Sequence, residues 1–598
     1  MSTSEPKPHR KVDRRTFLKG GLIVGGVAVG AGAAIKAAAD GTKKSPAVAS
    51  GSGTVRSAAP PAAANVAASS GRPPNILVIA VDQLRFPQWF GAGAAGAQLP
   101  PNIRRLREGG VSFGRHYTAS NDCTPSRAAM LTGLYTHQTG ALITGGSTLD
   151  PGFPTWGTML REHGYHTRWL GKWHLTRQDD KWHASTGERA LQRYGFAGGV
   201  FPSPDGGPGQ GWRTDPQIAS AFEHWFKHEG GSEPWCTTVS FVNPHDIAWW
   251  YVWTKRAPAE ASAPRYAQQL PPNFETPEQM EQRHKPLLQR SLQDTANTSF
   301  GTVPYSGARF EHKWLAFLDL YIKLQLEVDR HVGQVLRTLE SNPKVAANTV
   351  VIFTTDHGEY AASHGLRGKG ASAYEEALRV PLIVKDPRGV LTAATGQLRN
   401  QLTSSVDLAP LLLTIATGSS QWRHEAHYSQ IAGRLDLAPI LANPGAPGRP
   451  YVLHATDEIV TEFAIQPYAS DAPLHVLAIR TPNAKYATYS DWGSQQTTAL
   501  SIGQQTELYD YSTQAGRLEL DNVAGRSALE APMRAALARA VKNELHEPLP
   551  YRLQAAGRRG YSDYFRTAKG AATAATGHRK RTTERDLTPT DRTSGPEA

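Results

Sequence analysis

Ile76-Leu77-Val78-Ile79-Ala80-Val81, followed directly by Asp82-Gln83, is the stretch that decides the fold class. Its apolar residues are continuous rather than alternating, which is typical of a strand covered on both faces. Similar runs at 238–242 and 350–353 are each preceded by a segment with helical spacing of apolar residues. The sequence therefore predicts an α/β fold in which helices flank a large, mostly parallel sheet.

The chain has 598 residues, more than one hydrophobic core usually covers, so a large domain and a smaller one are expected. The main domain is predicted at 73–420, with a polar insertion at about 255–310. Shorter strand-like pieces predict a smaller C-terminal domain with an antiparallel sheet at 421–551. Residues 40–72 and 552–598 bury too little apolar surface to fold, so we expect a disordered linker and a disordered basic tail.

The composition excludes two classes of protein. The formal net charge is +12, but the excess of Lys and Arg lies at the two ends of the chain, which argues against a nucleic-acid interface on the folded body. The two cysteines, Cys123 and Cys236, exclude a disulfide framework, although one bridge is possible in an oxidising compartment. Cys236 is expected to be a buried, small apolar residue.

The N-terminus has the pattern of an export signal. Arg14-Arg15-Thr16-Phe17-Leu18-Lys19 precedes an uncharged run from Gly20 to Ala34 and resembles a twin-arginine signal. The run is shorter than the roughly 20 residues that span a bilayer, so no stable membrane anchor is expected. Residues 1–39 are therefore predicted to be a signal peptide, with the twin-arginine translocase as a partner and a periplasmic, cell-envelope or secreted location.

Reactive side chains follow the predicted strands. In an open α/β sheet, ligands bind outside the carboxyl ends of the strands, so these side chains are expected to converge on one edge. Carboxylate and amide oxygens with an imidazole suit a hard divalent cation. The stretches concerned are Asp82-Gln83, His245-Asp246, Asp356-His357 and, after a strand at 165–170, Lys172-Trp173-His174.

Cys123-Thr124-Pro125-Ser126-Arg127 is expected to begin a helix, because Pro125 is tolerated in a first turn and good helix formers follow. Cys123 would then lie at the helix N-terminus, where backbone N–H groups and the helix dipole favour an anion. Arg127, one turn inward, would add a cationic clamp.

This pentapeptide, with Leu131-Thr132-Gly133 after it, resembles the signature of the type I sulfatase family, within the alkaline phosphatase superfamily. The resemblance covers roughly residues 73–530 and implies an alkaline phosphatase-like fold and a sulfuric ester hydrolase. Further similar stretches are Gly171-Lys172-Trp173-His174, Asn243-Pro244-His245-Asp246, Thr355-Asp356-His357-Gly358-Glu359, His364 to Gly370, Glu507-Leu508-Tyr509-Asp510 and Leu520 to Ala524.

The resemblance also implies roles for single residues. A formylglycine-generating enzyme would oxidise Cys123 to formylglycine, whose hydrate attacks the sulfur of a small-molecule or carbohydrate sulfate ester. One divalent ion, Ca²⁺ with Mn²⁺ or Mg²⁺ as alternatives, would be held by Asp82, Gln83, Cys123, Asp356 and His357. The catalytic residues would be Cys123, Arg127, Lys172, His174, His245 and Lys369: Arg127 orients the formylglycine, Lys172, His245 and Lys369 bind the sulfate, His245 and Lys369 also assist the leaving group, and His174 is the base that restores the aldehyde.

Three alternatives stay open. Gln83 and His357 replace the Asp and Asn that are common in the family, and relatives with these variants include phosphonate monoester hydrolases, so a phosphonate monoester or phosphodiester hydrolase is the alternative function. A protein without the modification could also only bind sulfated ligands. Trp249, Trp250 and Trp253 either contact a sugar or aryl leaving group or pack in the core.

Overall fold

The computed structural model describes residues 72–86, 100–176, 190–199, 203–231, 234–256, 266–493 and 498–567. The expected signal peptide, almost all of the expected linker and the last 31 residues of the expected tail (568–598) lie outside the described residues. Within the described part of the chain, no helix is both long and apolar enough to cross a membrane.

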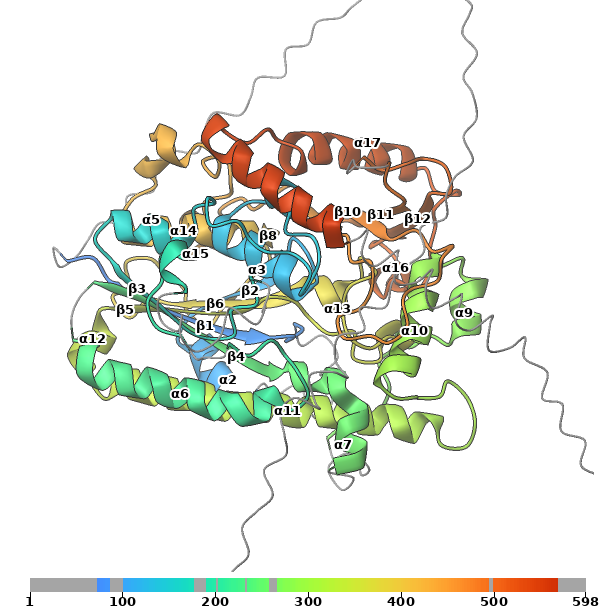
Figure 1. Cartoon of the computed structure of the whole chain (residues 1–598), viewed down its shortest axis with the longest axis horizontal. Coiled ribbons are helices and arrows are strands. Elements are labelled where there is room, and N and C mark those ends of the chain that lie inside the picture. Colours follow the sequence, from blue (N-terminus) through green and yellow to red (C-terminus); the bar gives the residue numbers. More distant parts are fainter. Residues whose placement is uncertain are drawn as a thin grey trace, which may run out of the picture.

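An eight-stranded sheet forms the centre of the main domain (Figure 1). Its order is β3-β4-β1-β5-β6-β2-β7, and β8 also pairs with β2. Neighbours run parallel except that β6 is antiparallel to both β5 and β2, so the prediction of a mostly parallel sheet is confirmed. The strands are β1 (Asn75–Asp82), β2 (Val111–Tyr117), β3 (His166–Gly171), β4 (Trp235–Pro244), β5 (Thr349–Thr355), β6 (Arg379–Lys385), β7 (Leu398–Arg399) and β8 (Thr403–Ser404).

Helices cover both faces of this sheet, which explains why β1 is apolar at every position from Ile76 to Val81 (Figure 1). Leu77 and Ile79 pack in one cluster with α2 (Pro101–Glu108), α6 (Gln210–Glu229) and α11 (Phe310–Glu340). Ile76 and Val78 pack in another with α3 (Cys123–Thr132), α5 (Trp156–Glu162) and α14 (Leu408–Thr417). The second cluster also contains Cys236, buried as predicted.

Besides these and a helix at 551–567, most of the helical elements within the described ranges are short. They are α4 (Thr136–Thr139), η2 (Gln192–Tyr194), η3 (His245–Trp249), α7 (Trp250–Arg256), α9 (Pro277–Gln282), α10 (Leu287–Phe300), α12 (Pro343–Ala347), η4 (Ser363–Gly365), α13 (Glu375–Leu378), η5 (Ser405–Asp407), η6 (Gln421–His424), η7 (Ala426–Tyr428), α15 (Ala438–Ala442), α16 (Gln514–Arg517), α17 (Glu530–Ala540) and η8 (Val541–Leu545).

A second, smaller sheet lies in the C-terminal part of the chain, as predicted (Figure 1). Its order is β12-β11-β10-β9 and all its pairs are antiparallel. Met533 and Leu537 of α17 pack on it in a cluster that also contains Ala119 and Ala129 of the main domain, so the two sheets share this core. The strands are β9 (Val452–Thr456), β10 (His475–Arg480), β11 (Ala484–Ser490) and β12 (Gln505–Asp510).

Two predictions from the sequence are wrong, because the segments concerned pack against distant parts of the chain. Residues 551–567 form a helix rather than a disordered segment, because Leu553, Ala556 and Tyr564 bury one face against the body of the protein. The prediction of a disordered tail is therefore wrong for residues 552–567. The prediction of a polar insertion at 255–310 is also wrong for α10. Leu288 and Leu292 of α10 are buried in the same core cluster as residues of the small sheet.

Asp215 of α6 fixes the end of β4 that leads to His245. Its carboxylate accepts hydrogen bonds from the backbone N–H groups of Val242 (2.7 Å) and Asn243 (2.9 Å), and Asp215 is 1% exposed. A buried N–H without a partner costs about 1–3 kcal/mol. The end of β4 therefore depends on this side chain.

We expect Asp215→Ala to lower the free energy of unfolding by about 1–3 kcal/mol for each N–H left unpaired. Urea unfolding followed by tryptophan fluorescence measures the loss. Asp215→Asn is the matched control, because it keeps one acceptor oxygen and should lose less. An unchanged urea midpoint for Asp215→Ala would show that β4 is held by other contacts.

Candidate functional site

The carboxyl ends of four neighbouring strands, β3, β4, β1 and β5, carry the predicted reactive residues, and the expected convergence on one edge is confirmed. Asp82 is the last residue of β1, and Asp356 directly follows β5. Lys172 directly follows β3, and His245 follows β4 as the first residue of η3. Cys123 reaches this edge from α3.

Cys123 is the first residue of α3, as the sequence predicts, and is fully buried. Its Sγ lies 3.1 Å from Nε2 of His357 and 3.8 Å from Nζ of Lys172. The helix start is anchored to the sheet by Ser126, whose hydroxyl donates to the main-chain carbonyl of Asp356. The pentapeptide thus places the cysteine and fastens it to β5.

Arg127 joins the helix to two strand ends. Its guanidinium donates to Oδ2 of Asp356 (2.8 Å) and Oδ2 of Asp82 (2.9 Å), and also to the carbonyl of Lys172 (2.9 Å). Burial alone would lower the pKa of Arg127, but the two carboxylates outweigh it and raise the pKa. We call Asp82, Arg127 and Asp356 the Arg127 cluster.

Four side chains present donor atoms that suit a divalent cation. One donor atom each of Asp82, Cys123, Asp356 and His357 lies within 4.8 Å of the others. Oδ1 of Asp82 is buried and has no hydrogen-bond partner. Nδ1 of His357 lies 3.0 Å from the carbonyl of Gly358, which only accepts, so Nδ1 carries the proton and the lone pair of Nε2 faces Sγ of Cys123. The donors therefore fit a metal ion.

Asp82 is ready to bind a cation at any ordinary pH. Burial alone would raise the pKa of this carboxyl, but the surrounding positive charges together outweigh it and hold the pKa well below the usual range. The largest of these is the charge of Lys172, whose Nζ lies 2.7 Å from Oδ2. The carboxylate is therefore ionised, and its free Oδ1 can become a ligand.

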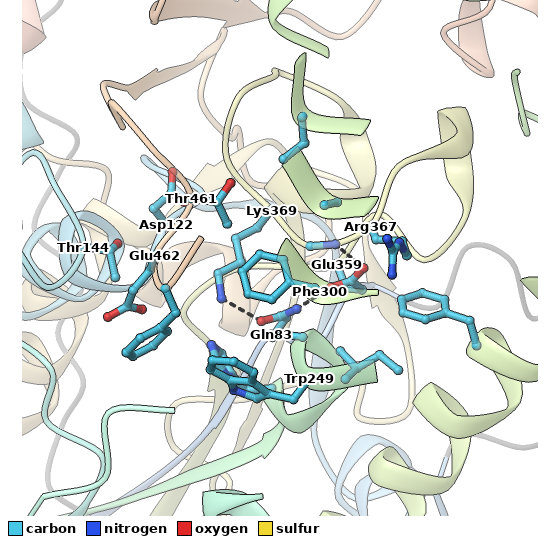
Figure 2. Close-up of a pocket in the computed structure, with 18 residues that line it drawn as sticks. Gln83, Asp122, Thr144, Trp249, Phe300, Glu359, Arg367, Lys369, Thr461 and Glu462 are labelled. Carbon is cyan, nitrogen blue, oxygen red and sulfur yellow. Dashed lines mark hydrogen bonds between the residues drawn. The ribbon is translucent and has the colours of Figure 1, made fainter. Parts of the chain in front are cut away.

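Gln83, the fifth predicted ligand, lies between two charged groups (Figure 2). Its Oε1 accepts from Nζ of Lys369 (2.7 Å), and its Nε2 donates to Oε2 of Glu359. Glu359 also accepts from the backbone N–H of Gly368, next to Lys369. Glu359 thus sets which end of the Gln83 amide faces the site. Glu359 ends the stretch Thr355–Glu359, which resembles the family pattern, but the sequence alone predicts no role for this residue.

A cavity opens beside these groups, with Trp249, Phe300, Lys369 and Glu462 on its walls (Figure 2). His245 also lines it, and neither ring nitrogen of His245 has a hydrogen-bond partner. Burial and then the charge of Lys369 lower the pKa of His245, so this ring is neutral. An unpaired, neutral imidazole beside a lysine is suited to a polar, anionic ligand.

The three tryptophans after His245 divide between the two predicted roles. Trp249 lines the cavity, in contact distance of Phe300 and Phe463 with ring centroids 5.7 and 5.4 Å apart. Trp250 packs in the core against Phe317, and Trp253 lies outside the cavity. Only Trp249 is placed to contact a ligand.

His174 is held by a residue that no sequence motif identifies. Its Nε2 lies 3.1 Å from Oε1 of Glu462, which lies between β9 and β10, 288 residues away. Burial alone would lower the pKa of His174, but Glu462 outweighs it and raises the pKa to about 9. Glu462 stands in no motif-like stretch, so only the tertiary structure reveals it.

Comparison with known proteins gives the family. Residues 74–419 match the family model described as Sulfatase. The uncharacterized sulfatase YidJ of Escherichia coli K12 is 28% identical over 363 residues, which cover 57% of this chain and 68% of that protein. Arylsulfatase K of Mus musculus is 26% identical over 468 residues, 75% of this chain and 76% of that protein.

Solved structures share the fold. The phosphonate monoester hydrolase SpPMH of Silicibacter pomeroyi has a TM-score of 0.59 at 22% identity, over 80% of this chain and 96% of that one. The segment matched by the family model includes β1, α3 and β5, and with them Asp82, Cys123, Asp356 and His357. Since the match covers more than half of the sequence, the chain belongs to the sulfatase family.

Proposed function

We propose that this protein hydrolyses a sulfate ester with a formylglycine formed from Cys123 as its nucleophile. Membership of the sulfatase family makes the chain a sulfuric ester hydrolase. The observation that carries the proposal is the position of Cys123, at the N-terminus of α3 with its Sγ within 4.8 Å of donor atoms of Asp82, Asp356 and His357. In the proposed active form, Sγ stands in for a hydroxyl oxygen of the hydrated aldehyde.

The proposed metal ligands are Asp82, Gln83, Asp356 and His357 together with the group at position 123. A bound divalent cation, with Ca²⁺ the first candidate, would lower the pKa of the attacking hydroxyl and of His174 and neutralise oxygens of the sulfate. Within the Arg127 cluster, the guanidinium holds the two aspartates in place while the substrate binds.

The chain's own residues then divide the remaining work. One hydroxyl at position 123 loses its proton to solvent and attacks sulfur, and the bond from sulfur to the ester oxygen breaks. The alcohol leaves with a proton from Lys369, while the neutral His245 ring donates a hydrogen bond to the departing oxygen. The second hydroxyl gives its proton to His174, the carbon–oxygen double bond re-forms, and sulfate departs with the electron pair of the broken carbon–oxygen bond. Lys172 and Lys369 hold the sulfate throughout.

Two further partners are proposed, one for export and one for maturation. The Arg14-Arg15 stretch supports export by the twin-arginine translocase, and Cys123 supports maturation by a formylglycine-generating enzyme. A phosphonate monoester or phosphodiester hydrolase is the second candidate function, because two proposed ligands are the variants Gln83 and His357. The backbone N–H of Gln83 donates to Oδ1 of Asp356 (3.3 Å), and His357 contributes a donor atom to the same cluster.

A substrate panel tests the proposed function. We expect kcat/KM to be higher for an aryl sulfate than for the matching phosphodiester and phosphonate monoester, because a sulfate monoester presents three non-bridging oxygens to the metal ion and the two lysines, whereas either phosphorus ester presents two and carries a further organic group. The three substrates must carry the same leaving group, so that only the transferred group differs. A kcat/KM that favours the phosphorus esters would establish the second candidate.

The nucleophile is tested by mass and by substitution. The peptide that spans residues 121–127 of active, natively produced protein is expected to carry the aldehyde in place of the thiol. Cys123→Ala should abolish turnover, because no other residue can form the intermediate, while a sulfated ligand still binds. A plain thiol in active protein, or turnover by Cys123→Ala, would contradict the proposal.

The orientation of the Gln83 amide is tested by exchanging two residues. Glu359→Gln frees the amide to turn its nitrogen toward the metal site, and Gln83→Glu sets two carboxylates against each other, so each should weaken Ca²⁺ binding about 10-fold or more, the change that the loss of a group supporting a metal ligand typically causes. The double exchange restores one oxygen toward the metal and one amide donor. Calorimetric Ca²⁺ affinity should therefore recover in the double variant, and failure to recover would show that Glu359 has no part in orienting the amide.

A further inference from the structure

Three acidic residues lie on the segment that leaves β9: Asp457 and Glu458 are buried, and Glu462 is half-buried. This segment belongs to the C-terminal part of the chain, yet Glu462 extends to the cavity of the main domain, beside Thr144 and Asp122 (Figure 2). Here a carboxylate from one part of the chain enters the site built by another.

Glu462 meets the site at His174. Oε1 of Glu462 lies 3.1 Å from Nε2 of His174, and the two side chains are 14% and 4% exposed. One donor atom each of Cys123, His174 and Glu462 lies within 4.8 Å of the others. The nucleophile position, the imidazole and the carboxylate therefore form one compact cluster, in which the hydrogen bond from Glu462 can orient the imidazole beside position 123.

The segment that carries Glu462 is fixed from both sides. Asp457 lies 3.0 Å from Nε2 of His137 and 3.2 Å from Nδ1 of His475, and Glu458 accepts from the backbone N–H of Thr144. Gly145 backs Glu462 closely, since a Cβ at Gly145 would lie 2.9 Å from Oε1. Glu462 is thus held at His174 by contacts independent of that pair.

We propose that Glu462 is the positioning residue for His174, so that position 123, His174 and Glu462 act as one proton relay in the step that releases sulfate. The inference rests on the proposed formylglycine mechanism. In that step the remaining O–H bond at position 123 breaks and its proton moves to His174, while the electron pair forms the carbon–oxygen double bond and sulfate leaves. Glu462 stays ionised and holds the imidazole toward the oxygen, so no further reactant is needed.

Removal of the carboxylate is expected to slow sulfate release and spare the first step. With full-length enzyme that contains formylglycine and metal, Glu462→Ala and Glu462→Gln should lower kcat by about 10²- to 10⁴-fold with little rise in KM, the range that a proton-transfer residue contributes. An aryl sulfate should give a burst of one equivalent of phenol followed by slow turnover. Intact mass should show one sulfo group added at the same time.

Formate separates positioning from a general structural role. Formate fits the space that Glu462→Ala creates and should restore turnover, whereas Glu462→Gln fills that space with an amide and should not respond. Glu281→Ala is the matched control, because the Glu281 side chain is 81% exposed, and neither the substitution nor formate should alter its turnover. In the double variant with His174→Ala, the loss should be no greater than in His174→Ala alone.

The outcomes distinguish this inference from the proposed function. If wild-type protein lacks formylglycine or sulfatase turnover, the proposed function itself fails. If wild-type protein is active while Glu462→Ala keeps its kcat, shows no burst, or loses activity that formate does not restore, the role of Glu462 is wrong and the proposed function stands.

Discussion

The buried guanidinium of Arg127 is the interaction on which the site depends. It donates to a carboxylate at the end of β1, to another after β5 and to a carbonyl after β3. A buried charge is tolerated only when it is paired and hydrogen-bonded, and here each partner also needs Arg127, since Asp82 and Asp356 would otherwise repel each other. The cluster thus fixes α3, and with it Cys123, against three strand ends at once.

Local sequence carried enough information to predict this part of the molecule. Continuous apolar runs identified β1, β4 and β5, and polar residues directly after them identified the edge where ligands bind. Helix-start chemistry placed Cys123 correctly. All of these depend on neighbours within a few residues, which is the range over which sequence patterns are informative.

The residues that escaped prediction depend on long-range packing. Glu462 pairs with His174 across 288 positions, and nothing in its neighbourhood distinguishes it from a solvated glutamate. Residues 552–567 have the composition of a basic tail, but their few apolar side chains are buried against residues that are distant in sequence. The polar stretch before 310 contains α10, whose Leu288 and Leu292 are core residues. Composition describes an average, whereas burial is decided by single side chains.

The burial of the site also bears on when the proposed aldehyde forms. Every residue from Cys123 to Thr132 is buried in the folded chain, and Arg127 is held by partners on three strands. A second enzyme needs access to the backbone and thiol of the pentapeptide, and opening α3 would leave the charges of Asp82, Arg127 and Asp356 unpaired in the interior. Conversion of Cys123 is therefore favourable only before this edge of the sheet has closed. Twin-arginine export, as proposed for this chain, carries folded proteins, so the modification belongs on the side of the membrane where the chain is made.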